Sequence, residues 1–491
     1  MKSQALLSLY AAAVMAIKPI EIKGTHMFEY GTGKPFQVRG VDYYPRPNAG
    51  LLDVNNHDFF TDDYQDVWEN HIKEFIALGV NAVRLYAVDP SKSHDKFMCA
   101  LSGAGIYVLV DLASSCENCA ITSDPHPACY PAALKTRGQQ IITAFSKYNN
   151  VLGFSAGNEV NHVVTNMNTN APCQKKFIRD MRAFVSSCAS KMRSIPVGVV
   201  LADTDRGPNA LYYGCRTNPN DVLENVEWYG LNAYLQCDPL ASLNPTVVGA
   251  GYRNLLTDFQ SYKLPFPSLL TEFGCLNSGF PTKQGYAAQR TWLDAGWLLS
   301  STFSDVFAGG FAFEFSTENA NSKADSPHPF TSFGTQNYGL GYFSPVTCDS
   351  TSTPCKFNRM PNFDDLATQY LNTNSTAALP VKSAYTPTIT SFPACPAGVP
   401  GLSGVTWPSD SQTDMLCPDL TQTPLCPGDV INTATGTTLP PSTATVSPVP
   451  NVPTVTPAST GGSQGSAGYQ SASTPASVSA VVVVAIALLV V

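Results

Sequence analysis

Charged residues are scarce in this chain of 491 residues, where they make up 13% against the roughly 25% usual for soluble domains. Basic residues are outnumbered: 29 Lys and Arg stand against 37 Asp and Glu, which leaves a net formal charge of −8. A protein that grips a phosphate backbone needs a basic surplus, so the composition argues against a nucleic-acid partner. The seven histidines are scattered without the spacing of metal ligands, and neither a metal nor another cofactor is expected.

Charge is absent altogether from the last 62 residues, which follow Asp429. Residues 478–491 are almost purely Val, Ala, Leu and Ile, and as a helix they would span about 21 Å, less than the roughly 30 Å of a bilayer core. Small residues at 465–468, a polar spacer and this apolar tail have the pattern of a GPI-attachment signal. A true tail anchor is the alternative, although no basic residues flank the tail.

The N-terminus has the pattern of a secretory leader. Met1 and Lys2 precede an apolar run at residues 5–17, with small residues before a cleavage point after Ala16. A buried core helix is the alternative interpretation of this run. With a leader, the even number of 14 cysteines indicates a disulfide framework rather than a set of cytosolic thiols.

Strand-like and helix-like segments alternate between residues 20 and 350. Eight β-branched or aromatic runs are predicted strands: residues 36–41, 82–86, 106–112, 151–156, 197–202, 228–231, 268–271 and 309–315. Six helices are predicted between them, at residues 66–78, 93–103, 131–148, 174–193, 247–261 and 284–299. This order predicts an α/β fold, a (β/α)8 TIM barrel. A doubly wound open sheet is the alternative, but no glycine-rich phosphate loop follows the first strand.

These features divide the chain into five parts. They are a signal peptide at 1–16, a catalytic barrel at 20–375, a Cys- and Pro-containing extension at 376–430, a stalk at 431–465 and a GPI-attachment signal at 466–491. The stalk is inferred from composition, because 18 of the 45 residues from 433 to 477 are Ser or Thr, interleaved with Pro. Such a segment cannot bury enough apolar surface to fold, so we expect it to be disordered and extended.

Two glutamates stand at matching strand ends. Glu159 follows the fourth predicted strand and Glu272 the seventh, and the C-terminal strand ends of a barrel carry its chemistry. Strands four and seven lie across the barrel mouth, so the two carboxyls can flank one bond. Paired carboxylates cleave glycosidic bonds, one as a protonated acid and one as an ionised nucleophile, with carboxyls about 5–5.5 Å apart in retaining enzymes. The alternative for either residue is a structural salt bridge.

Several stretches together resemble glycoside hydrolase family 72, the β-1,3-glucanosyltransferases of fungal and oomycete walls. The matching residues are 81–90, 153–160, 228–234, 271–275 and 309–316. The resemblance implies that Glu159 is the acid/base and Glu272 the nucleophile. It also implies that Asn158 holds the sugar 2-hydroxyl near the nucleophile and that Tyr234 hydrogen-bonds the nucleophile and keeps it ionised.

The resemblance further implies a substrate groove lined by Tyr86 and Asp111 on its donor side, although packing at the barrel rim is the alternative for both. Tyr44 stands where the family usually has Gln, and it is expected to contact substrate. Phe313 and Phe315 replace tyrosines that usually flank the glutamate after strand eight. Each replacement removes a hydroxyl that could bind sugar, so weaker acceptor binding and a larger hydrolytic leak are expected.

Disulfide pairs are also implied by the resemblance: Cys99–Cys129, Cys237–Cys275, and Cys215 with Cys348 or Cys355. Cys116 and Cys119 are spaced as Cys-x-x-Cys, but the chain has no second such pair, so zinc is not expected.

The resemblance implies a retaining β-1,3-glucanosyltransferase that cleaves β-1,3-glucan and transfers the new end to another glucan. We expect it to act as a monomer outside the cell, on the wall side of the membrane, held by a GPI lipid. The alternatives are a secreted β-glucan hydrolase on the same scaffold and an inactive wall-binding protein, and the presence of both glutamates argues against the latter.

Overall fold

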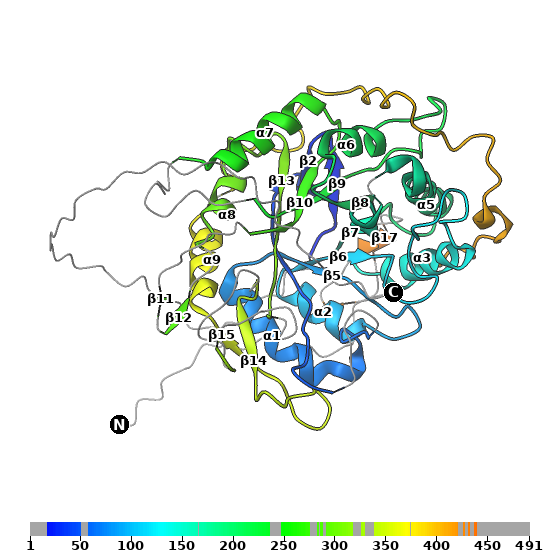
Figure 1. The fold of residues 1–491 in the computed structure, drawn as a ribbon. Helices are drawn as coiled ribbons and strands as arrows, with labels where there is room; N and C mark the ends of the chain where they lie inside the picture. The colour runs from blue at the N-terminus through cyan, green and yellow to red at the C-terminus, as the bar shows by residue number, and fades with distance from the viewer. Residues whose placement is uncertain are drawn as a thin grey trace, which may run out of the picture. The chain divides into compact units, whose positions relative to one another are not determined.

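Eight parallel strands close into a barrel, and they correspond to the eight strands that the sequence predicts (Figure 1). In order around the barrel they are β10 (Ser268–Phe273), β13 (Phe307–Ala312), β4 (Val38–Asp42), β5 (Ala82–Leu85), β6 (Tyr107–Asp111), β7 (Val151–Asn158), β8 (Val197–Ala202) and β9 (Tyr229–Ala233). The predicted (β/α)8 barrel is therefore confirmed, and β8 has the bounds that its β-branched run predicts.

The molecule was analysed as a computed structural model. It describes residues 17–50, 57–164, 166–235, 247–274, 282–283, 285–287, 291–317, 326–328, 338–373, 375–420, 426–427, 431–432 and 437–438. All of these belong to one structural unit, Met1–Val449. Within them, no helix has both the length and the apolar character needed to span a bilayer. The predicted signal peptide and GPI-attachment signal lie outside the described residues, as does nearly all of the stalk.

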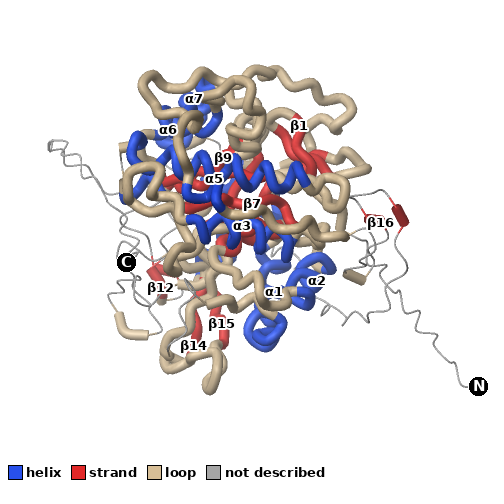
Figure 2. Tube along the Cα trace, turned by 90° about the vertical axis from the view of Figure 1, so that its right-hand side faces the viewer, coloured by secondary structure: helices blue, strands red, loops and turns tan. Residues whose placement is uncertain are grey.

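Helices surround the barrel, and in Figure 2 α3, α5 and α6 run across its strands. The helices are α1 (Gln65–Leu78), α2 (Asp95–Gly103), α3 (Ala132–Phe145), α4 (Val160–Val163), α5 (Met167–Ser187), α6 (Arg206–Gly214), α7 (Ala250–Tyr262), α8 (Leu293–Leu298) and α9 (Pro361–Asn372). Helix α1 buries Trp68, Ile72 and Phe75, spaced three and four residues apart as an amphipathic helix requires. It ends at Gly79, whose φ of 74° is easily adopted only without a side chain.

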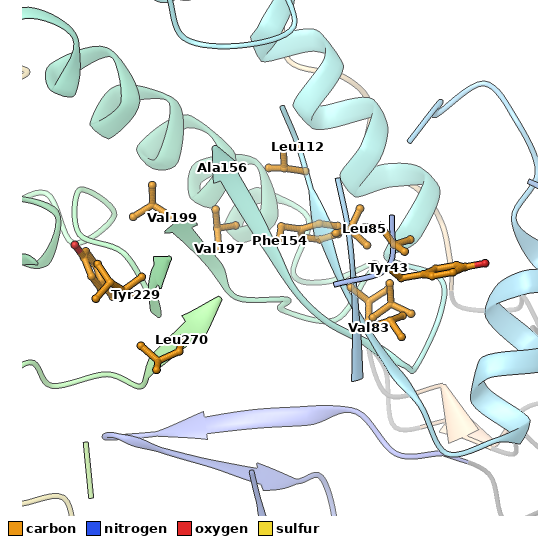
Figure 3. Close-up of a cluster of buried hydrophobic side chains, with 14 of the residues drawn as sticks. Tyr43, Val83, Leu85, Leu112, Phe154, Ala156, Val197, Val199, Tyr229 and Leu270 are labelled. Atoms are coloured by element: carbon orange, nitrogen blue, oxygen red, sulfur yellow. The ribbon is translucent and has the colours of Figure 1, made fainter. Parts of the chain in front are cut away.

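Side chains of the barrel strands alternate between two hydrophobic clusters, as strand geometry dictates. One cluster joins outward-facing residues such as Val83 and Phe154 to the surrounding helices, and Figure 3 shows part of it. The other joins Ala82, Leu109 and Leu152 to the N-terminal sheet. That sheet consists of β1 (Ile20–Lys23), β2 (His26–Glu29) and β3 (Pro35–Phe36). The N-terminal half of the barrel interior is thus apolar, which leaves the opposite mouth for polar side chains.

Short paired strands lie outside the barrel. They are β11 (Thr282–Lys283) with β12 (Tyr286–Ala287), β14 (Gly341–Ser344) with β15 (Lys356–Arg359), and β16 (Ile431–Asn432) with β17 (Thr437–Thr438). Within the described ranges, short 3-10 helices span Asp62–Tyr64 and Pro408–Ser411. The hairpin β14–β15 leads into α9, whose Tyr370 hydroxyl donates to the Gly40 carbonyl 2.8 Å away. Helix α9 therefore completes the outer layer beside α1 and α8.

The extension beyond residue 375 runs along the outside of α6, α5 and α3, in the orange part of Figure 1. Polar contacts attach it to each helix in turn: Tyr212 of α6 donates to Pro400, Lys176 of α5 pairs with Asp410, and Lys135 of α3 donates to Gln412. The extension therefore packs on the barrel over much of its length.

Disulfides tie this extension to the barrel in a way that the sequence did not predict. Cys99 bonds Cys426, Cys188 bonds Cys417 and Cys215 bonds Cys395. Three bonds are more local: Cys129–Cys173, Cys116–Cys119 and Cys348–Cys355. The predicted pairs Cys99–Cys129 and Cys215–Cys348 are therefore wrong, because the extension brings its own cysteines to Cys99 and Cys215. The predicted pair Cys237–Cys275 lies outside the described residues.

Candidate active site

Polar side chains meet at the C-terminal mouth of the barrel, opposite the apolar end. Asn158 ends β7 and Glu159 follows it, while Asp111 ends β6. Glu272 lies within β10, and Tyr234 comes directly after β9. The structure therefore brings these predicted residues together at one face of the barrel.

Glu272 is held by three hydrogen-bond donors. The Tyr86 hydroxyl donates to Oε1 over 2.8 Å, and the Tyr234 hydroxyl donates to Oε2 over 2.5 Å. The Arg84 guanidinium also donates to Oε1, over 3.2 Å. Burial, reinforced by the charge of Glu272, raises the pKa of both tyrosines well above its usual value, so the phenols stay protonated as donors. Only 6% of Glu272 is exposed to solvent, and these three donors stabilise the charge of its carboxylate in place of water.

Arg84 is the cation at the centre of the site, and it was not among the predicted site residues. Its Nε and Nη2 pair with the Asp111 carboxylate at 3.4 and 2.9 Å, and Nη2 also donates to Asn158 Oδ1 over 2.9 Å. Its Nη1 donates to Thr271 O over 3.3 Å, in addition to Glu272. A single arginine inside an apolar strand was the sequence signal for this role, because a buried guanidinium requires acidic partners.

Asp111 lies against Arg84 with 2% of its surface exposed, and it is an ion-pair partner rather than an open groove residue. Burial raises the pKa of Asp111 to about 6, even though Arg84 acts in the opposite direction. Its carboxylate therefore orients the guanidinium that in turn contacts Asn158 and Glu272.

Glu159 sits where β7 turns into α4. Its backbone is left-handed, with φ 51° and ψ 30°, and its amide donates to the Val200 carbonyl over 3.0 Å. Such conformations are costly for residues other than glycine and concentrate at active sites. Burial, followed by the charge of Glu272, raises the pKa of Glu159 to about 7. A carboxyl with a pKa near neutrality can both deliver and accept a proton at ordinary pH.

Asn232 of β9 links the two ends of this site and was also missed as a site residue. Its Nδ2 donates to Glu159 Oε1 over 2.9 Å and to Asn158 Oδ1 over 3.1 Å. The polar network therefore runs without a break from Glu272 through Arg84, Asn158 and Asn232 to Glu159. The sequence signal for Asn232 was weak, because asparagine after a strand is also common as a turn residue.

The aromatic residues divide into partly exposed and buried ones. Tyr86, Tyr234 and Phe313 are half-buried, and Phe313 packs against Tyr234 with ring centroids 5.9 Å apart. Tyr44 is only 5% exposed, covered by Tyr86 and by the Arg46 guanidinium 4.1 Å from its ring centre. Tyr44 thus supports Tyr86 and leaves little of its own ring for a sugar.

Phe315 is fully buried and stacks on Phe357 at 4.3 Å in the hydrophobic core. The expectation that the replacement at Phe315 removes a sugar-binding hydroxyl is wrong, because the side chain at this position lies in the core. A hydroxyl at position 315 would not reach a sugar. Of the two positions, only Phe313 is partly exposed.

The described side chains contain no group of three or more His, Cys, Asp or Glu residues arranged to hold a metal ion. The two carboxyls at this mouth lie in different environments. Both oxygens of Glu272 accept hydrogen bonds from buried donors, whereas burial and the charge of Glu272 raise the pKa of Glu159 to about 7.

Comparison with known proteins gives one consistent result. The family model for glucanosyltransferases, glycoside hydrolase family 72, matches residues 9–323. The 1,3-beta-glucanosyltransferase GAS4 of Saccharomyces cerevisiae is 32% identical over 64% of this chain and 63% of its own length. The 1,3-beta-glucanosyltransferase PGA4 of Candida albicans is 31% identical over 63% of this chain and 62% of its own. The chain thus spans just under two thirds of these curated relatives.

Solved structures agree with the sequence comparison. Saccharomyces cerevisiae Gas2p in complex with laminaripentaose is similar with a TM-score of 0.56 and 26% identity, over 72% of this chain and 69% of that chain. The complex of the same protein with laminaritriose and laminaritetraose has a TM-score of 0.54 and 27% identity, over 72% of this chain and 68% of that chain.

Proposed function

Because the chain belongs to glycoside hydrolase family 72, we propose that it is a retaining β-1,3-glucanosyltransferase. The observation that carries the proposal is the contrast between its two carboxyls. Glu272 is held as a carboxylate by Tyr86, Tyr234 and Arg84, whereas burial and the charge of Glu272 raise the pKa of Glu159 to about 7. A retaining mechanism requires this division between an ionised nucleophile and a protonated acid.

In the first step, Glu272 attacks the anomeric carbon of a glucan and the glycosidic bond breaks. The Glu159 proton goes to the leaving glycosidic oxygen, so the reducing-end fragment departs as a neutral alcohol. Glu272 becomes a glycosyl ester and loses its negative charge. Glu159, having given up its proton, becomes the one charged carboxylate of the two.

In the second step, Glu159 acts as the base. It takes the proton from the hydroxyl of an incoming glucan, whose oxygen attacks the anomeric carbon and expels Glu272 as a carboxylate. Two inversions at the anomeric carbon retain its configuration. If water takes the place of the acceptor, the same step is hydrolysis, so the acceptor side of the groove decides the outcome. The half-buried rings of Tyr234 and Phe313 are the candidates for holding an acceptor there.

We propose β-1,3-glucan as donor and acceptor. Gas2p, the similar solved structure, is in complex with laminari-oligosaccharides. The proposed location is outside the cell, on the wall side of the membrane. In the described part of the chain every cysteine is in a disulfide, which supports an oxidising compartment. The GPI anchor is proposed from the sequence pattern of the tail, and phosphatidylinositol-specific phospholipase should release the protein from membranes.

Incubation with a reduced laminari-oligosaccharide tests the proposal. Products longer than the starting chain are expected, because a transferase returns the donor fragment to another glucan. Glu159→Gln and Glu272→Gln serve as inactive controls of the same preparation. If only shorter products form at every acceptor concentration, the protein is a hydrolase, and if none form from any β-1,3-glucan, the enzyme assignment fails.

A further inference from the structure

We propose that Thr271 and Asn232 are positioning residues that determine which oxygen of Glu159 carries the transferable proton. The inference rests on the proposed function, because it assigns roles within the same reaction. It follows from a chain of hydrogen bonds that starts at Arg84 and ends at Glu159. Each hydrogen bond in this chain fixes the orientation of the next side-chain amide, and so fixes which of its atoms donates.

Arg84 decides the first link. A guanidinium has donors and no acceptor, so the atom of Asn158 that lies 2.9 Å from Arg84 Nη2 must be the amide oxygen. That same oxygen lies 3.1 Å from the side-chain amide of Asn232. Since an oxygen cannot donate, Asn232 must present its NH2 group to Asn158.

The orientation of Asn232 then decides its other two contacts. Its NH2 group also donates to Glu159 Oε1 over 2.9 Å. Its amide oxygen therefore faces Thr271, whose hydroxyl donates to it over 2.9 Å. Thr271 is fully buried and Asn232 is 2% exposed, so neither side chain is open to solvent. The Thr271 hydroxyl therefore acts on the site through Asn232, which donates to both Glu159 and Asn158.

The consequence for Glu159 concerns the location of its proton. Oε1 accepts from Asn232, so in the acid form the proton occupies Oε2, the oxygen left for the glycosidic bond. Among the described residues, the charged and titratable groups that act on Glu159 are Glu272 of β10, Arg84 of β5 and the phenol of Tyr234, and none of these three donates to Oε1 in place of Asn232. Without the Thr271 hydroxyl, the Asn232 oxygen loses its buried donor and the amide is free to tilt away from Glu159.

The test compares two leaving groups in Thr271→Val, which removes the hydroxyl while keeping the shape. A laminari-oligosaccharide needs a proton on its departing oxygen, whereas a dinitrophenyl β-laminaribioside departs without one. Thr271→Val is expected to lower kcat/KM about tenfold for the oligosaccharide and by no more than about twofold for the aryl glycoside. In this variant, the basic limb of the pH profile of kcat/KM for the oligosaccharide should move to higher pH. The reason is that Glu159 loses a donor that favours its ionised form.

Three further variants complete the test. Thr271→Ser keeps the hydroxyl and should restore the wild-type ratio between the two substrates. Asn232→Ala should show the same leaving-group dependence as Thr271→Val. Thr257→Val makes the same substitution on the exposed face of α7 and should change neither rate. Activity on the aryl glycoside also reports that each variant is folded.

The outcomes separate the inference from the function beneath it. Equal loss on both substrates in Thr271→Val, or no loss on either, would overturn the positioning roles while the wild-type enzyme remains a transglycosylase. If the wild-type protein processes neither substrate, it is the proposed function that fails.

Discussion

Removing the charge of Glu272 is expected to lower the pKa of Glu159. Burial is the larger cause that raises this pKa from 4.5 to about 7, and the charge of Glu272 is the second. The substitution Glu272→Gln keeps the shape and burial of the site but removes the charge. Asn232 and Arg84, which favour the ionised form of Glu159, remain in place.

The size of the effect follows from the expected geometry. Two charges about 5.5 Å apart, at an effective dielectric constant of about 20, interact by about 3 kcal/mol, or roughly 2 pKa units. This is an upper bound, because burial accounts for the larger part of the rise. We therefore expect the pKa of Glu159 to fall by about one to two units in the variant. The same fall occurs during turnover, when esterification consumes the charge of Glu272 and prepares Glu159 to act as the base.

Carbon-13 NMR of a protein labelled at the glutamate side-chain carboxyl carbons measures this shift directly. The Glu159 signal is assigned from its absence in Glu159→Gln, and Glu69→Gln on the exposed face of α1 is the control that should leave it unchanged. A Glu159 pKa that stays the same or rises in Glu272→Gln would refute the electrostatic coupling of the two carboxyls.

Three further results are expected. Tyr234→Phe removes a charge-assisted hydrogen bond to Glu272 worth about 1.5–3 kcal/mol, so kcat should fall roughly 10- to 100-fold with the fold intact, and an unchanged kcat would contradict the role of this phenol. Phe315→Tyr should lower the free energy of unfolding by about 1–3 kcal/mol because it buries an unpaired hydroxyl, whereas Phe313→Tyr should not. If the two variants are equally stable in a denaturant titration, the placement of Phe315 in the core is contradicted. Peptide mapping without reduction should recover Cys99 linked to Cys426 and Cys129 to Cys173, and a Cys99–Cys129 peptide would contradict the path of the extension.

The barrel was predictable because each strand is a short apolar run bounded by turn residues. The helices were less predictable than the strands. Helices α6 and α9 were not predicted, and α8 begins at Leu293 rather than near residue 284. Gly207 and Pro208 interrupt the helical pattern of α6, and Pro361 begins α9 at a position where proline is tolerated but seldom diagnostic.

The two glutamates were predictable because parallel strands of a barrel end at the same mouth. Their partners were harder to find. Arg84, Asn232 and Thr271 act through hydrogen bonds between different strands, and strand register decides which of them meet. The disulfides were unpredictable for a similar reason, since Cys99 and Cys426 are 327 residues apart and pair through the path of the extension.

Trapping the glycosyl-enzyme tests the central claim most directly. A 2-deoxy-2-fluoro laminaribioside with a dinitrophenyl leaving group should label the protein, because the fluorine slows both steps whereas the activated leaving group accelerates only the first, so the glycosyl-enzyme accumulates. Peptide mass spectrometry is expected to find one disaccharide on the peptide that contains Glu272, and none in Glu272→Gln. Label on Glu159, or turnover of β-1,3-glucan with inversion and no covalent adduct, would contradict the assignment of Glu272 as the nucleophile of a retaining enzyme.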